Sequence, residues 1–248
     1  MISYEMTADE IVSADPEMAI LPVGSMEQHG PHLPIGTDWY IADALGKGVA
    51  ELTGGFLLPA LPISTCRENM GKKGTVWMDP DHFYHMLISI LMSLKEQGFK
   101  KVAILQCHGG IFIMTPIIRQ VNATNNPDFM VVNIDYSCVP PLFPIQSPVP
   151  GQVEIHAGDE ETSVMLHIAP QTVQMEKAEA GWPTVPRPYL SYGSIFRATP
   201  NGVWGDPTGA TAEKGRQILE YRVKAVAEEI DKAFAYIESK EKLGYSYF

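Results

Sequence analysis

Two carboxylates and two histidines lie within one short, turn-rich segment that runs from Glu27 to Asp38. Glu27 and His29 are two residues apart, so in an extended chain both side chains project to the same face. Prolines and glycines then turn the chain back, which allows Asp38 to approach that pair. Imidazole together with carboxylates is a ligand set for divalent zinc, manganese or iron. An exposed polar loop has a similar composition, so the segment alone leaves both interpretations open.

A third histidine, His108, follows an apolar run and precedes Gly109 and Gly110. Glycines permit close backbone approach, which suits a histidine that reaches a metal or a small ligand, although a loop histidine in a glycine turn is an equal alternative. Cys107 beside it is a candidate thiol nucleophile. A cysteine at the end of a strand is more often a small buried hydrophobe, and that is the favoured interpretation.

His156 and Glu161 bracket the expected start of a helix near Asp159. A general base and a metal-binding carboxylate would be well held at such a position. An acidic first turn also favours the positive end of a helix dipole, so simple capping explains Asp159 and Glu160 equally well.

Other polar segments have simpler explanations. His82, His85 and His167 are expected on helix surfaces or in packing. The glycine-rich turn at 201–215 is expected to lead into a packed helix, because it lacks the lysine spacing of a phosphate-binding loop.

Apolar runs alternate with helical patterns along the chain. The expected strands are Met18–Val23, Gly55–Ile63, Lys101–Gln106 and Phe129–Ile134, and the expected helices are Trp39–Leu52, Pro80–Gln97, Thr115–Asn125 and Thr211–Glu238. This alternation predicts an α/β fold with a mostly parallel sheet that helices cover on both faces. In such folds the loops at the carboxyl ends of the strands form the functional crevice.

Composition narrows the class of protein. A net charge of -11 over 248 residues argues against nucleic acid as a partner, since phosphate binding needs a basic surface. No apolar run approaches the ~20 residues of a membrane span, and the N-terminus lacks the features of a signal peptide. Three scattered cysteines fit a reducing cytoplasm. The proline-rich segment 139–150 is interpreted as a loop within one domain that comprises residues 1–248.

Taken in order, these motifs resemble the creatininase family of metal-dependent amidohydrolases. The matching pieces extend over about residues 20–215: Leu21–Pro34 with Asp38, His108-Gly109-Gly110, His156–Ser163 and Trp204–Pro207. The resemblance implies a three-layer α/β sandwich, a site for two divalent metal ions and a homo-oligomer, specifically a hexamer.

The resemblance also implies individual roles. It places Glu27, Asp38 and His108 on one metal, and His29 with the bridging Asp38 on the other. Creatininase has a further glutamate ligand where this chain has Gly110, and Glu161 is expected to replace it. His156 matches the histidine that shuttles protons, so His156 and Glu161 are the expected catalytic residues.

The implied reaction is hydrolysis of a C–N bond in a small cyclic amide, creatinine-like, by a water that the two metals activate. A second hypothesis keeps the metal site but changes the substrate to a formamide, a peptide, or a cyclic polyol ketone such as a dehydro-inosose. A third is a catalytically silent metal-binding protein.

The departures from the family pattern concern the substrate side. Family members commonly have Glu-His in the second loop, where this chain has Glu68-Asn69. Expected substrate-binding residues are therefore Glu68, Asn69, Cys107 and Gly109. Arg67, Lys72 and Lys73 would favour an anionic or polyhydroxylated substrate, unless they are simply solvated.

Overall fold

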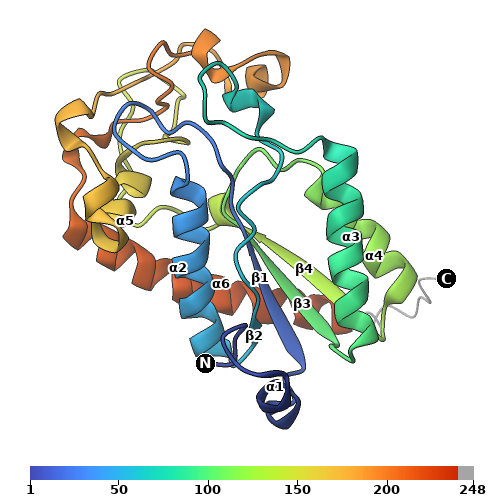
Figure 1. Cartoon of the computed structure of the whole chain (residues 1–248). Helices are drawn as coiled ribbons and strands as arrows, with labels where there is room; N and C mark the ends of the chain where they lie inside the picture. Colours follow the sequence, from blue (N-terminus) through green and yellow to red (C-terminus); the bar gives the residue numbers. More distant parts are fainter. Residues whose placement is uncertain (240–248) are drawn as a thin grey trace.

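A four-stranded, all-parallel sheet forms the centre of the computed structural model, which describes residues 1–239 (Figure 1). The strand order is β2(Phe56–Leu57), β1(Met18–Val23), β3(Lys101–Gln106), β4(Met130–Asp135). The helices in the described part of the chain are α1(Ala8–Ala14), α2(Thr37–Thr53), α3(Pro80–Glu96), α4(Met114–Asn125), α5(Asp159–Ile168) and α6(Ala212–Glu238).

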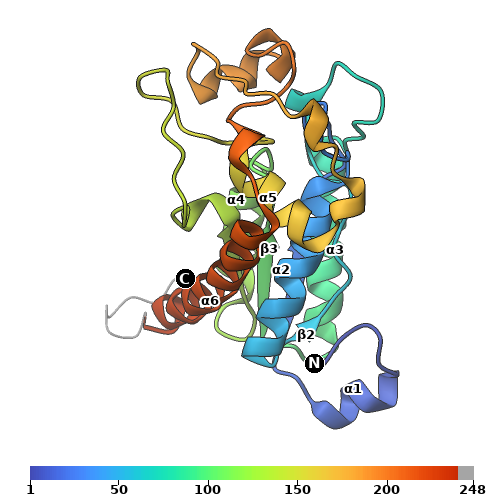
Figure 2. The ribbon, with the colours of Figure 1, turned by 90° about the vertical axis from the view of Figure 1, so that its left-hand side faces the viewer.

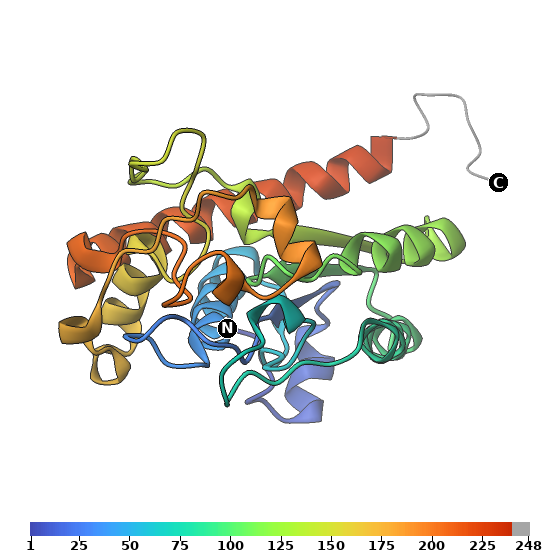
Figure 3. The ribbon, with the colours of Figure 1, turned by 90° about the horizontal axis from the view of Figure 1, so that it is seen from above.

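Both faces of the sheet are buried, as the continuous apolar runs predict. Alternate strand residues point to opposite faces. Ile20 and Leu105 pack with α2 and α6 on one face. Leu21 and Ile104 pack with α3 and α4 on the other. Figure 3 shows α6 along one side of the molecule and α3 on the opposite side. The predicted three-layer α/β sandwich is confirmed.

Besides the sheet and the helices on its two faces, the structure has a region of α5 and loops above the carboxyl ends of the strands. Helix α5 packs against α2 and α6. The segments before and after it are loops and short 3-10 turns, drawn in yellow and orange at the top of Figures 1 and 2. These segments cover the edge of the sheet at which the predicted crevice should lie.

The expected strand Gly55–Ile63 is wrong beyond β2. Pro59 and Pro62 cannot donate to a strand ladder, so pairing stops after Leu57 and resumes only as a single bridge between Val23 and Leu61. The other expected elements agree with the structure to within two residues at each end.

In the described part of the chain, no helix combines the length and the apolar character that crossing a membrane requires.

Candidate metal centre

The candidate ligands come from two strand ends and two helix starts. Glu27 and His29 follow β1, and His108 follows β3, so parallel strands deliver them to the same edge of the sheet. Asp38 lies in the first turn of α2, and Glu161 lies in the first turn of α5. The structure therefore brings together all five predicted metal ligands.

Close contact between β1 and α2 sets the position of Asp38. A Cβ added at Gly24, just after β1, would lie 2.7 Å from the backbone carbonyl of Asp38 and from the Cα of Trp39. Only glycine allows this approach. The Ser25 hydroxyl then donates a hydrogen bond to Asp38 Oδ2 at 2.9 Å, which fixes the carboxylate.

The two oxygens of Asp38 face different histidines. Oδ1 lies 3.0 Å from His29 Nε2, and Oδ2 lies 3.1 Å from His108 Nδ1. Glu161 Oε2 approaches the same His29 nitrogen at 3.8 Å, and Glu27 Oε2 approaches the same His108 nitrogen at 3.2 Å. Asp38 therefore lies between two groups of candidate ligands, one around each histidine.

Hydrogen bonds on the far sides of the rings fix which nitrogens face the site. His29 Nδ1 lies 3.1 Å from the Glu27 carbonyl, which can only accept, so this nitrogen carries the proton. In the neutral ring, which is the metal-binding form, His29 Nε2 then carries the lone pair and faces Asp38. A backbone carbonyl that orients an imidazole in this way is typical of metal-binding histidines.

Glu27 provides a direct test of whether a cation fits. Its carboxylate is fully buried, and within the described residues neither oxygen has a hydrogen-bond partner. A buried carboxylate without hydrogen bonds is costly unless a cation compensates it. The ligand atoms of Glu27, Glu68 and His108 lie within 4.8 Å of one another, as do those of His29, Asp38 and Glu161. The donor set therefore fits divalent metal ions.

The pKa shifts in the cluster also indicate that its buried carboxylates lack a compensating positive charge. Burial raises the pKa of Glu27 and raises that of Glu161 to about 8. Burial alone would lower the pKa of His29, but the charge of Asp38 outweighs it and raises the value to about 10. Protons are thus held tightly where a divalent cation would displace them.

The three consecutive acids of α5 have different partners. Asp159 pairs with Lys214 at 3.0 Å, and Glu160 pairs with Arg222 at 2.6 Å. Glu161 alone faces the candidate site. Neither Asp159 nor Glu160 is needed as a cap, because the carboxylate of Glu154 accepts the N–H groups of both residues.

Backbone strain helps to hold Glu161. Ala157 has a φ of 52°, in the left-handed region that side chains other than glycine rarely adopt. In this conformation its N–H donates to Glu161 Oε2 at 2.6 Å. Such strain is often concentrated at functional sites.

Glu68 occupies the space left by the missing side chain of Gly110. A Cβ at Gly110 would lie only 1.6 Å from Glu68 Oε1, and the same oxygen lies 3.1 Å from His108 Nε2. A carboxylate there orients His108 so that Nδ1 faces Glu27 and Asp38. The expected substrate residue thus contacts a candidate metal ligand.

His156 lies against the cluster from the loop before α5. Its ring centre is 4.3 Å from that of His29. Its Nε2 donates to the Gln28 carbonyl at 2.8 Å, which leaves Nδ1 as a lone pair, 3.5 Å from Glu27 Oε1. Burial, and next the nearby His29, lowers the pKa of His156. His156 is therefore neutral near pH 7 and able to accept a proton.

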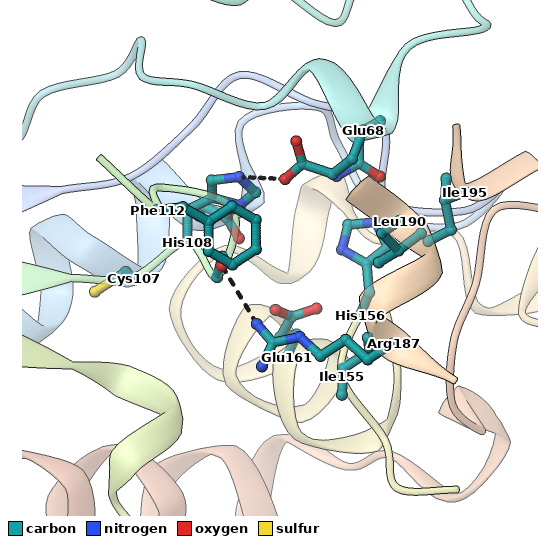
Figure 4. Close-up of a pocket in the computed structure, with 14 residues that line it drawn as sticks. Glu68, Cys107, His108, Phe112, Ile155, His156, Glu161, Arg187, Leu190 and Ile195 are labelled. Carbon is teal, nitrogen blue, oxygen red and sulfur yellow. Dashed lines mark hydrogen bonds and ion pairs between the residues drawn. The ribbon is translucent and has the colours of Figure 1, made fainter. Parts of the chain in front are cut away.

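A small pocket of about 60 Å³ opens beside these groups (Figure 4). All four expected substrate residues, Glu68, Asn69, Cys107 and Gly109, line it together with Asp38, His108, His156 and Glu161. Burial, followed by the Asp38 charge, raises the pKa of Cys107, so the thiol stays protonated and is no nucleophile.

The pocket also has lining residues that sequence reasoning missed. Arg187, Leu190 and Ile195 come from the 3-10 turns above the sheet and carry no recognisable motif. Glu154, which holds the start of α5, was missed as well. Glu154 precedes the first residue of α5 by five positions, and acceptor side chains just before a helix commonly cap it. That position was the one sequence signal for its role.

The remaining histidines lie away from the ligand atoms. His82, His85 and His167 are exposed on helices, as expected. His32 is fully buried behind the cluster, where its Nε2 lies 2.9 Å from the Thr162 hydroxyl.

Comparison with known proteins agrees with this geometry. The chain belongs to the creatininase family, because the family model described as creatinine amidohydrolase matches residues 4–230. It is 31% identical over 228 residues to a mycofactocin precursor peptide peptidase of Mycobacterium ulcerans, a match that covers 86% of this chain and 84% of the relative. It is 28% identical over 241 residues to the creatinine amidohydrolase of Pseudomonas putida, covering 90% of this chain and 92% of that one.

Solved structures extend the match to three dimensions. A crystal structure of creatinine amidohydrolase (creatininase) superposes with a TM-score of 0.77 at 26% identity, covering 94% of this chain and 98% of the other. Similar structures at 25% identity include a zinc–zinc form and a manganese form of creatininase. Proteins of the creatininase family are hydrolases, and the relatives differ in substrate.

Proposed function

We propose that this chain is a two-metal amidohydrolase that uses an activated water to hydrolyse a carbonyl C–N bond in a small cyclic amide, creatinine-like. The observation that carries the proposal is the disposition of Asp38, whose two oxygens face His29 and His108 separately. A single carboxylate that faces two ligand groups in this way suits a site for a pair of ions.

Glu27, His108 and Asp38 would hold one ion, and His29, Asp38 and Glu161 the other. The candidate metals are zinc, manganese and iron, which this nitrogen and oxygen donor set accepts. When bound, the pair would lower the pKa of a shared water toward neutrality and polarise the substrate carbonyl.

The side chains beside the cluster supply the remaining chemistry. His156, neutral and with its Nδ1 lone pair toward the cluster, takes up a proton and returns it to the leaving nitrogen. Glu68 holds the ring of His108, and Ala157 holds the carboxylate of Glu161. Leu190 and Ile195 add apolar side chains to the lining of the pocket.

A peptide bond is the second candidate substrate. A larger groove of about 690 Å³ has Glu68, Gly110, Phe112 and Leu190 in common with the small pocket, so the two are continuous. That groove gives room for a chain extending beyond the hydrolysed amide. The mycofactocin peptidase relative supports the same alternative.

The proposal extends to the whole assembly. We expect a homo-oligomer, a hexamer as in the family resemblance, and a cytoplasmic location. The cysteines Cys66, Cys107 and Cys138 are all unpaired, which fits a reducing compartment.

The test is metal analysis followed by a substrate panel. Protein purified without chelator should hold close to two divalent ions, and zinc- or manganese-loaded enzyme should open creatinine or a related lactam. The panel should also contain peptides, formamides and a cyclic polyol ketone. Less than one tightly bound ion would contradict the two-metal site. Full metal content without turnover of any compound would favour a silent metal-binding protein.

Asp38→Ala should abolish both metal binding and activity, because it removes the only carboxylate that faces both histidines among the described residues. Metal content by mass spectrometry and turnover on the same preparation measure this. Asp135→Asn is the matched control. Asp135 lies at the carboxyl end of β4, the strand next to β3, where it accepts hydrogen bonds from Ser137 and Gln106. An active Asp38→Ala protein would exclude this residue as the bridge.

A further inference from the structure

We propose that Arg187, positioned by the carbonyl of Gly109, forms a carboxylate-binding subsite beside the metal cluster, so that the substrate amide bears a free carboxylate. The inference rests on the proposed function, since it assumes that the amide lies in this pocket. Of the two candidate substrates it favours the second, the open-chain peptide bond, and it names that class more narrowly, as an N-acyl amino acid or a short peptide with a free carboxyl terminus.

Arg187 is the one lysine or arginine that lines the small pocket within residues 1–239. Its Nη2 donates to the Gly109 carbonyl at 3.2 Å, and Figure 4 shows the guanidinium directed toward the groups of the pocket. The contacts found in the described chain include no ion pair for Arg187. A guanidinium has five N–H donors, so most of this fork is available to a ligand.

Gly109 makes room for the guanidinium. A Cβ at this position would lie 2.8 Å from Arg187 Nη2, a separation that requires something to shift. Arg187 is also flanked by Pro186 and Pro188, whose fixed φ angles restrict the backbone that carries it. Gly109 therefore leaves space for the Arg187 guanidinium, and the two prolines restrict the backbone that positions it.

Two of the other candidate cations contact groups outside the small pocket. Arg67 lies over the ring of Trp77 and 3.6 Å from Asp79, and Lys72 lies over the ring of Phe196. Neither these two nor Lys73 line the small pocket. The anion preference expected from Arg67, Lys72 and Lys73 is therefore reassigned to Arg187.

Arg187 lies in the lining of the same small pocket as the candidate ligands. Its Nη2 contacts the carbonyl of Gly109, the residue directly after His108, and His108 and Glu161 line this pocket as well. A carboxylate on Arg187 and an amide carbonyl at the cluster would therefore belong to one small substrate. Planar guanidinium groups pair well with carboxylates through two parallel hydrogen bonds.

Binding of a matched pair of probes tests the inference without any turnover. N-acetylglycine and N-acetylglycinamide differ only in the carboxylate, and their affinities for the zinc-loaded protein are measured by calorimetry. Wild-type protein should prefer the acid by about tenfold, the size expected of a charge-assisted hydrogen bond in a partly exposed site. Arg187→Met should remove that preference, and Arg187→Lys should restore part of it.

Arg197→Met is the matched control. Arg197 is an exposed arginine of the same region that lines a neighbouring groove and does not line the small pocket, so its loss changes net charge equally. Equal loss of preference in this variant would reduce the effect to long-range charge and overturn the subsite. Retention of the preference in Arg187→Met would place the carboxylate on the metals and overturn it as well.

Creatinine separates the subsite from the proposed reaction. It lacks a substituent carboxylate, so Arg187→Met should weaken its binding no more than it weakens the binding of N-acetylglycinamide. If no amide is hydrolysed but the acid preference depends on Arg187, the proposed function fails and the subsite stands. If creatinine is opened and the probe pair binds equally, the subsite fails and the amidohydrolase proposal stands.

Discussion

His156 differs from the other two imidazoles of the cluster in the sign of its pKa shift. The acidic neighbours raise the pKa of His29 and His108 against the effect of burial. Burial, and then the charge of His29, lowers the pKa of His156. The surroundings of His29 and His108 therefore stabilise a cation, whereas His156 stays neutral and can accept a proton during a reaction.

His156→Ala should keep the metal and lose most of the rate, by about 10²–10⁴-fold, the usual contribution of a positioned acid–base group. Steady-state kinetics and metal content on one sample measure both effects. His85→Ala, an exposed helix position, is the control. Loss of one ion from His156→Ala would instead make this residue a ligand.

His32 should destabilise the metal-free protein in acid. Burial lowers its pKa from 6.5 to about 4, with His29 as a further cause. Between these values the unfolded chain binds a proton that the folded chain refuses, so the free energy of unfolding falls as pH drops from 6.5 toward 4. His32→Gln should make that slope shallower. Urea unfolding of both proteins at several pH values measures the difference, and equal slopes would contradict it.

At the scale of elements, the site depends on the close approach of β1 to α2. Gly24→Ala would insert a methyl group 2.7 Å from the backbone of α2. Overpacking of this kind typically costs about 1–3 kcal/mol. We expect lower stability together with weaker metal binding, because Asp38 shifts away from Glu27. Chemical unfolding and metal titration measure these effects.

Gly36→Ala is the control for this contact. It lies at the start of the same helix, but its added Cβ meets only ordinary contacts at 3.8–3.9 Å. If both variants behaved alike, the effect would come from the helix start in general and not from the contact with β1.

The sequence predicted the elements well where one physical signal dominates. Buried parallel strands are continuous apolar runs, and β1 and β3 have the predicted bounds. The extension of β2 failed because its apolar residues are interspersed with prolines, and pairing needs backbone N–H groups as well as hydrophobicity. Among the acids of α5, only packing against Lys214 and Arg222 distinguishes Asp159 and Glu160 from Glu161.

At the scale of the molecule, the last helix ties the halves of the chain together. Helix α6 packs on β4, α2 and α5, so the segments on both sides of the loop 139–150 share one core. The proposal of a single domain over 1–248 predicts one cooperative unfolding transition. Calorimetry and fluorescence should give coincident midpoints. Two resolved transitions would contradict it. Residues 240–248 lie outside the described part.

The ligand set could be predicted because it lies in compact motifs at strand ends, whereas the substrate side could not. Arg187 reaches the pocket from an irregular segment whose path depends on tertiary packing, and neither periodicity nor spacing indicates where such a segment folds back. The candidate metal-binding residues could therefore be predicted from the sequence, whereas the candidate substrate-selecting residue Arg187 could not.

The pairing of Glu68 with Gly110 has a consequence for how such sequences diverge. The Glu68 carboxylate fills the volume that any side chain at position 110 would enter. A side chain at position 110 would require the Glu68 carboxylate to move away from His108, and loss of Glu68 would leave a gap beside His108. The two positions should covary across related chains, although they are 42 residues apart in the sequence, with α3 and β3 between them.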